Sequence, residues 1–205
     1  MNDLEFAALL VSRVCHDLVS PVSAVMNGLE VLEDERDAAM RADALKLVTS
    51  SAEQAAARLQ FARIAFGAAG SAGAQLDLNE VGRMTKGLLK GGKVEMEWGA
   101  ASLNWPKDWA KLLMNAALMA ADSLPRGGKV QVHTSNDPSA PSFTVRATGP
   151  GARVLEEVEK AARGEPNGPV DGRSIQPFLT HKLARSLNAG LTLTFRDNEV
   201  ELAAG

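Results

Sequence analysis

The sequence predicts an α+β protein, in which an N-terminal helical hairpin is followed by an α/β domain. Residues 3–66 contain no glycine except Gly28 and no proline except Pro21, as expected of long helices. The run 67–73 is rich in glycine, alanine and serine and predicts a flexible linker. After it, short strand-like and helix-like runs alternate. We therefore expect a hairpin domain at 1–67, a linker at 68–75 and an α/β domain at 76–205.

Composition narrows the classes of partner. The 205 residues are 45% hydrophobic and 23% charged, which is ordinary for a soluble globular protein. A formal net charge of -3 argues against nucleic acid and anionic membranes as partners. The single cysteine, Cys15, excludes an internal disulfide, and we expect it to be a small buried residue. With no signal-peptide pattern and no stretch approaching ~20 apolar residues, a cytoplasmic location is expected.

Apolar residues at spacings of three and four predict the two helices of the hairpin. Asn2 and Glu5 form a capping box for the first helix, and the acidic run 33–37 makes the turn. The first stripe consists of Val11, Val14, Leu18, Val22, Val25, Leu29 and Leu32, and the second of Leu45, Val48, Ala52, Ala55, Leu59, Ala62 and Phe66. Two helices alone enclose a thin core, so we expect a homodimer that completes a four-helix bundle.

The second domain shows alternating helical and strand patterns. Helices are predicted at about 79–90, 106–123, 152–162 and 174–188, with Pro106 in the first turn of its helix. Strands are predicted at 93–98, 129–134, 143–147, 191–195 and 199–202. The three histidines lack metal-ligand spacing and there is no cysteine pair, so no metal site of its own is expected.

His16 is the strongest candidate for chemistry. At about 100° per residue it points almost directly away from Val14, Leu18, Val25 and Leu32. A polar face formed by Arg13, Ser20, Ser23 and Asn27 surrounds it. An ordinary solvated histidine is the simplest interpretation, but two neighbours favour a functional one.

Asp17 and Pro21 are these two neighbours. A carboxylate next to an imidazole can hold the tautomer that leaves the other ring nitrogen nucleophilic. Pro21 lacks the amide that would bond to the Asp17 carbonyl, so it frees that carbonyl and bends the helix beside His16.

The run His16-Asp17-Leu18-Val19-Ser20-Pro21 resembles the phospho-acceptor box of sensor histidine kinases. The longer run from Ser12 to Glu30 is still more similar to the histidine phosphotransferases of alphaproteobacteria. This resemblance implies that His16 is the phospho-acceptor. It also implies a dimerisation hairpin followed by an α/β sandwich resembling the ATP-binding domain of histidine kinases.

The ATP-binding residues implied by that resemblance are missing. The run 111–128 resembles the N box, but Met119 stands where kinases have an asparagine for Mg²⁺, which needs hard oxygen ligands. Ala147 replaces the adenine-binding aspartate of the Asp-x-Gly-x-Gly box. The run Gln176–His181 has no glycine where a phosphate loop is expected. We therefore expect a degenerate domain that does not bind ATP.

The sequence thus predicts a phosphotransferase that relays a phosphoryl group through His16 between receiver-domain aspartates. Asp17 orients the imidazole; Arg13 is a candidate for holding phosphate oxygens, and Ser20, Ser23 and Asn27 are candidates for receiver docking. The chain needs no cofactor, because Mg²⁺ comes from the receiver. The resemblance implies a hybrid kinase receiver as donor and CtrA-like or CpdR-like response regulators as acceptors. The alternatives are an ATP-dependent histidine kinase and a non-catalytic receiver-binding module.

Overall fold

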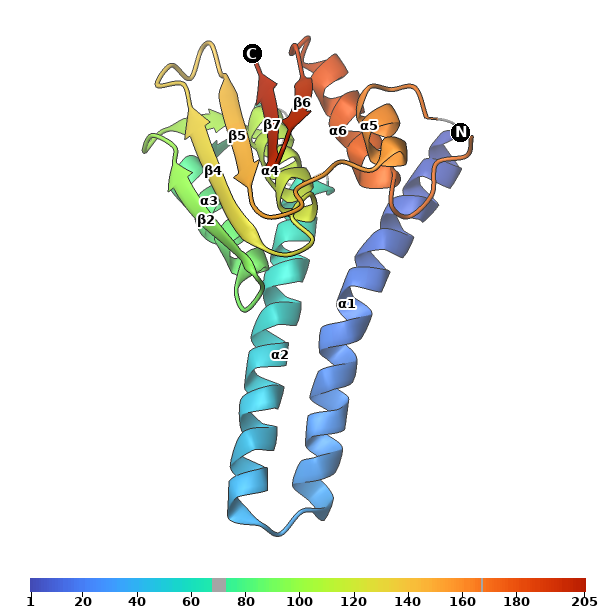
Figure 1. Cartoon of the computed structure of the whole chain (residues 1–205), viewed down its shortest axis with the longest axis vertical. Helices are drawn as coiled ribbons and strands as arrows, with labels where there is room; N and C mark the ends of the chain where they lie inside the picture. The colour runs from blue at the N-terminus through green and yellow to red at the C-terminus, as the bar shows by residue number, and fades with distance from the viewer. Residues whose placement is uncertain (68–72, 167) are drawn as a thin grey trace.

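The computed structural model describes residues 1–67, 73–166 and 168–205 and shows a long helical hairpin that projects from an α/β domain (Figure 1). The expected linker lies largely outside the described residues, and its last predicted residue, Gln75, already belongs to a strand. The hairpin consists of α1 (Asp3–Asp34) and α2 (Ala38–Ala65). The N-terminal end of α1 lies beside the helices of the second domain.

Helix caps fix the ends of the hairpin as the sequence predicts. The Asn2 side chain accepts from the Glu5 amide at 2.9 Å, and the Glu5 carboxylate accepts from the Asn2 amide at 3.0 Å. Asp37 caps α2 through the amides of Ala39 and Met40. The acidic turn therefore both ends one helix and starts the next.

The two helices touch closely near the turn. A Cβ added at Gly28 would lie 2.6 Å from Val48 Cγ2, so only glycine fits this approach. The side chains of Val14, Leu18, Val25 and Leu32 are half-buried in the seam. Val11, Val22 and Leu29 are instead 61%, 49% and 42% exposed. The single stripe expected on α1 is therefore two stripes, one facing α2 and one facing solvent.

By length and composition, α1 could also cross a membrane. Its mean hydropathy reaches 1.3 in a window that is 6% buried. By this test of length and composition, the expectation that no stretch of the chain is apolar enough to span a membrane is wrong. A helix from a soluble protein's core passes the same test, and this one carries Arg13, His16 and Asp17 near its middle.

The second domain contains a five-stranded sheet with strand order β2-β4-β5-β7-β6. Its strands are β2 (Val94–Gly99), β4 (Gly128–Thr134), β5 (Phe143–Thr148), β6 (Thr192–Arg196) and β7 (Glu199–Ala204). Its helices are α3 (Leu78–Leu89), α4 (Lys107–Asp122), α5 (Glu156–Ala162) and α6 (Ile175–Ser186). β2 and β4 are parallel, and the other neighbours are antiparallel. Helical and strand layers form the expected α/β sandwich.

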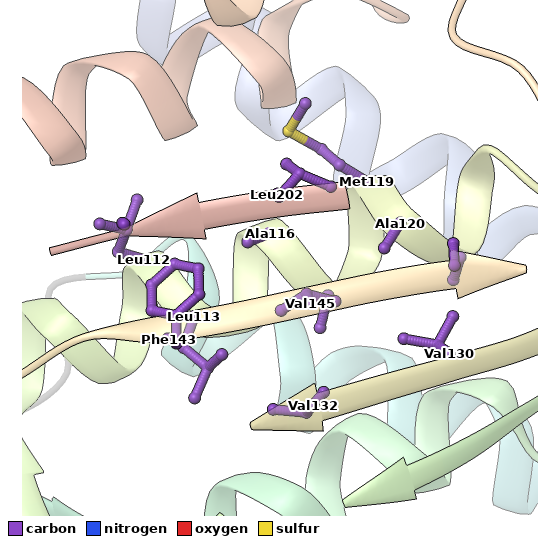
Figure 2. Close-up of a cluster of buried hydrophobic side chains, with 14 of the residues drawn as sticks. Leu112, Leu113, Ala116, Met119, Ala120, Val130, Val132, Phe143, Val145 and Leu202 are labelled. Atoms are coloured by element: carbon purple, nitrogen blue, oxygen red, sulfur yellow. The ribbon is translucent and has the colours of Figure 1, made fainter. Parts of the chain in front are cut away.

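The core lies between α4 and the inner face of the sheet (Figure 2). Strand burial alternates, so Val130, Val132 and Val145 are fully buried while Arg146 faces out to pair with Glu201. α4 is buried on nearly all sides because α2, α3 and α6 also pack against it. This places the end of α2 firmly against the second domain.

Three details differ from the sequence predictions. A short antiparallel pair, β1 (Gln75–Asp77) and β3 (Asn104–Pro106), was not expected, because three residues are too few for a period to be recognised. Pro106 is the N-cap of α4 rather than a residue of its first turn. α5 begins at Glu156, later than the expected 152.

Candidate functional site

His16 lies on the open side of α1, with 86% of its side chain exposed. Ser20, Ser23 and Asn27 are also exposed and continue along the same face of the helix. Helix geometry places them at about 20–40° around the axis from His16, over an axial distance of about 16 Å. The imidazole is therefore accessible to another macromolecule, with a polar surface running away from it.

A carboxylate and a guanidinium stand behind the imidazole. Asp17 Oδ1 lies 3.4 Å from Nδ1 of His16, and Asp17 Oδ2 accepts a 2.9 Å hydrogen bond from Arg13 Nε. If Nδ1 carries the ring proton, Nε2 keeps its lone pair and faces outward. The 3.4 Å separation is long for a hydrogen bond, as is common before a partner binds.

Pro21 leaves the Asp17 carbonyl without its helical partner, and α2 supplies a replacement. The Arg58 guanidinium donates from Nη1 to the Asp17 carbonyl oxygen. A freed carbonyl in a half-buried seam would otherwise be unsatisfied. Sequence reasoning identified the free carbonyl but missed Arg58, although an arginine that interrupts the small-residue pattern of the second helix was a visible signal.

Arg13 joins α1 to the second domain rather than facing outward with His16. Only 19% of its side chain is exposed, and Nη2 lies 3.6 Å from Asp122 Oδ2 at the end of α4. Nη1 donates to the Gly172 carbonyl at 3.4 Å. The geometry therefore gives Arg13 an interdomain role, and its expected contact with phosphate oxygens would require it to leave these acceptors.

Burial and neighbouring charges shift the pKa of Arg13 in opposite directions. Burial alone would lower the pKa of Arg13, but the hydrogen bond and charge of Asp17, helped by Asp122, raise it overall. Desolvation by the surrounding protein raises the pKa of the Asp122 carboxyl. The Arg13 charge lowers this pKa and the Asp17 charge raises it further, so the net shift is upward. Asp122 still opens into a pocket, with 57% of its side chain exposed.

Two cavities meet at Arg13 and Asp122. One cavity of about 230 Å³ lies between the hairpin and the second domain, and its walls include Asp17 and Arg58. The other, of about 180 Å³, lies within the second domain at the place where the resemblance implies a nucleotide site. Its walls include Met119, Gln176 and the apolar residues Val158, Leu193 and Leu202.

The residues of the second cavity do not fit Mg²⁺-ATP. Met119 offers a thioether where an oxygen ligand is needed, and Ala147 is fully buried without a carboxylate. Residues 175–186 form α6, so the expected phosphate loop is helical.

Gln176 and Phe178 have structural contacts instead. Gln176 is buried and donates to Asn115 Oδ1 at 2.9 Å, while Phe178 packs edge-on against Phe6 of α1. His181 stacks on Phe178. The segment that replaces the phosphate loop thus ties the second domain to the hairpin.

Other candidate residues remain apart from this site. His133 is exposed on β4, whose neighbouring residues Val132 and Thr134 face inward or are half-buried. Cys15 is exposed, so the expectation that it is buried is wrong. Within 1–67, 73–166 and 168–205, no group of three His, Cys, Asp or Glu side chains could hold a metal ion.

An exposed histidine on a helical hairpin, backed by a carboxylate and joined to an α/β domain, defines a phosphotransferase-like class. Comparison with known proteins agrees. Residues 78–199 match the histidine phosphotransferase C-terminal domain, and the chain belongs to this histidine phosphotransferase family.

Individual relatives extend over the whole chain. The chain is 38% identical over 205 residues to the protein phosphotransferase ChpT of Brucella abortus (strain 2308), covering 100% of this chain and 97% of that protein. A solved bacterial phosphotransferase is 35% identical with a TM-score of 0.89, over 100% of this chain and 98% of the other. The Acinetobacter baumannii histidine kinase AdeS matches at 13% identity and a TM-score of 0.49, over 92% and 95%. The chain is therefore a ChpT-type protein phosphotransferase.

Proposed function

We propose that this phosphotransferase carries the phosphoryl group on His16 and passes it between the aspartates of receiver domains. The observation that supports this most is the exposure of His16 together with Asp17 Oδ1 at 3.4 Å from its Nδ1. This arrangement leaves Nε2 free to meet a partner and gives the ring a fixed negative neighbour.

The proposed transfer needs no proton movement. The Nε2 lone pair forms a bond to phosphorus, the bond from phosphorus to the receiver aspartate oxygen breaks, and that electron pair returns to the aspartate carboxylate. Nδ1 keeps its proton, so the ring gains positive charge, which Asp17 stabilises. The reverse reaction passes the group to a second receiver, and the receiver supplies Mg²⁺ in both directions.

The receiver is proposed to dock along the exposed face of α1. Ser20, Ser23 and Asn27 extend that face beyond His16, and they are small enough for a helix or loop to approach closely. The donor is proposed to be a hybrid kinase receiver and the acceptors CtrA-like or CpdR-like response regulators. This assignment rests on the similarity to ChpT.

The chain is also proposed to be a homodimer. Val19, Val22 and Met26 are 62%, 49% and 54% exposed on α1, and Leu45 and Leu59 are 57% and 55% exposed on α2. These three α1 side chains lie about 60–120° around the helix from His16, so burying them leaves the imidazole open. A second hairpin of the same chain would cover both stripes, because two further helices packed against this pair complete a four-helix bundle.

The alternative of an ATP-dependent kinase is disfavoured by Met119, Ala147 and the helical segment 175–186. The alternative of a non-catalytic binding module predicts receiver binding without label on this chain. A single assay separates them: incubation with a receiver carrying labelled aspartyl phosphate, and separately with labelled Mg²⁺-ATP.

We expect acid-labile label on the wild-type chain from the receiver and none on His16→Gln. His133→Gln is the matched control, because His133 is also exposed but lies far along the chain on β4. Label on His16→Gln, or its loss in His133→Gln alone, would show that the acceptor is misassigned. Label from ATP alone would support the kinase.

A further inference from the structure

Three charged side chains from two domains form a continuous line behind His16. Asp17 lies next to the imidazole, Arg13 binds Asp17 at 2.9 Å, and Asp122 at the end of α4 lies 3.6 Å from Arg13. Only Asp17 is adjacent to the reacting ring. The second domain therefore reaches the site through Arg13.

The three nitrogens of the Arg13 guanidinium have three different acceptors. Nε donates to Asp17, Nη2 faces Asp122 and Nη1 donates to the Gly172 carbonyl. Because the guanidinium is a rigid planar fork, these acceptors together fix its orientation. Without Asp122, Arg13 could turn to bind both oxygens of Asp17, which would remove Oδ1 from His16.

The formal charges around Asp17 also indicate a role for Asp122. Arg13, Asp17 and Asp122 together carry a formal charge of -1, and Arg58 at the Asp17 carbonyl brings the group to zero. Without Asp122 the sum is +1, which opposes the positive charge that the imidazole gains when it is phosphorylated. Asp122 thus offsets the arginine charge where transfer needs a negative neighbour.

We propose that Asp122 is a positioning residue for phosphoryl transfer at His16, acting through Arg13 on Asp17. This inference rests on the proposed function and gives the second domain a part in the reaction. Asp122 touches neither the phosphoryl group nor the imidazole; it holds Arg13, and Arg13 holds the carboxylate that orients the ring.

The test compares Asp122→Asn with Asp122→Glu and Phe178→Leu in the full chain. Asp122→Asn keeps the shape and removes the charge, and Asp122→Glu restores it. Phe178→Leu weakens the separate contact with Phe6 and leaves Asp122 and Arg13 in place. Circular dichroism checks that each variant is folded.

Two measurements are made on each variant. Single-turnover transfer from a phosphorylated receiver gives the rate at saturation and the half-saturating receiver concentration. Nitrogen NMR of the unphosphorylated protein gives the fraction of His16 that carries its proton on Nδ1, and this measurement does not depend on phosphoryl transfer.

We expect Asp122→Asn to slow the saturated rate by about 10-fold to 100-fold, the size of effect that misplacement of a reacting group produces. Half-saturation should stay unchanged, the Nδ1-protonated fraction should fall, and Asp122→Glu should recover much of both. An unchanged rate and tautomer in Asp122→Asn, or an equal effect in Phe178→Leu, would overturn the proposal. A wild-type chain that takes no label would instead overturn the proposed function, while the NMR comparison would still report whether Asp122 orients His16.

Discussion

Asn115→Ala is expected to destabilise the protein strongly, because Asn115 connects α4 both to α2 of the hairpin and to α6. It is fully buried on α4. Its Nδ2 donates to the Ala65 carbonyl at the end of α2 at 3.0 Å, and its Oδ1 accepts from Gln176 of α6 at 2.9 Å. Alanine leaves the Ala65 carbonyl and the Gln176 amide without this partner.

The size of the loss follows from these contacts. Each buried group left without its partner costs about 1–3 kcal/mol, and Gln176 still bonds to the Asn115 carbonyl and Thr180, so its share is small. A total of about 2–4 kcal/mol is expected. For a chain of this length, each kcal/mol lowers Tm by about 2–4 °C, which gives a decrease of about 4–16 °C.

The assay is thermal unfolding followed by circular dichroism at one protein concentration. Asn79→Ala is the matched control, because Asn79 is exposed and its side chain makes only a 3.5 Å contact with Ser102. We expect that control to change stability by no more than about 0.5 kcal/mol. If Asn115→Ala melted within 2 °C of Asn79→Ala, by the scale of about 2–4 °C per kcal/mol, the inferred network would not stabilise the fold.

Three further outcomes are expected. Ser23→Glu should slow receiver transfer about tenfold or more without changing Tm, because it places charge on the proposed docking face; unchanged kinetics would move docking elsewhere. Leu59→Glu should give monomers in sedimentation experiments, because an unpaired charge would be buried in the proposed dimer. A wild-type chain that sediments as a monomer would contradict the proposed dimer. Titration calorimetry with Mg²⁺-ATP should show no saturable micromolar binding, since Met119 and Ala147 cannot replace the missing oxygen ligands; clear saturation would contradict this.

The element pattern of the fold was largely predictable from the sequence. The capping box at Asn2 and Glu5 and the run 3–66, in which Gly28 is the single glycine, correctly predicted the hairpin. The strands of the larger sheet were predicted because inward and outward residues alternate. Periodicity did not separate the two apolar stripes of α1, because Val11 and Val14 are both apolar, although Val14 is half-buried and Val11 is exposed.

The candidate site was predictable only where it lies on one helix. His16 and Asp17 are adjacent in sequence, and Pro21 is four residues after Asp17, so local geometry was enough. Arg58 and Asp122 come from other elements, and their approach depends on how α2 and α4 pack. A lone aspartate in a helix has no sequence signal for such a contact, and the interruption of the small-residue pattern at Arg58 does not say which atom the arginine meets.

The contact between Arg58 and the Asp17 carbonyl has a consequence for how this helix pair can change in evolution. An ordinary residue in place of Pro21 would supply the missing amide, and Arg58 would then be free to vary. While Pro21 remains, losing Arg58 leaves the Asp17 carbonyl oxygen without a partner beside His16. The two positions are therefore energetically coupled, and the effect of changing one depends on the other. Proline on one helix and arginine on the other therefore act as a pair that keeps α2 in a fixed register against the turn that bears His16.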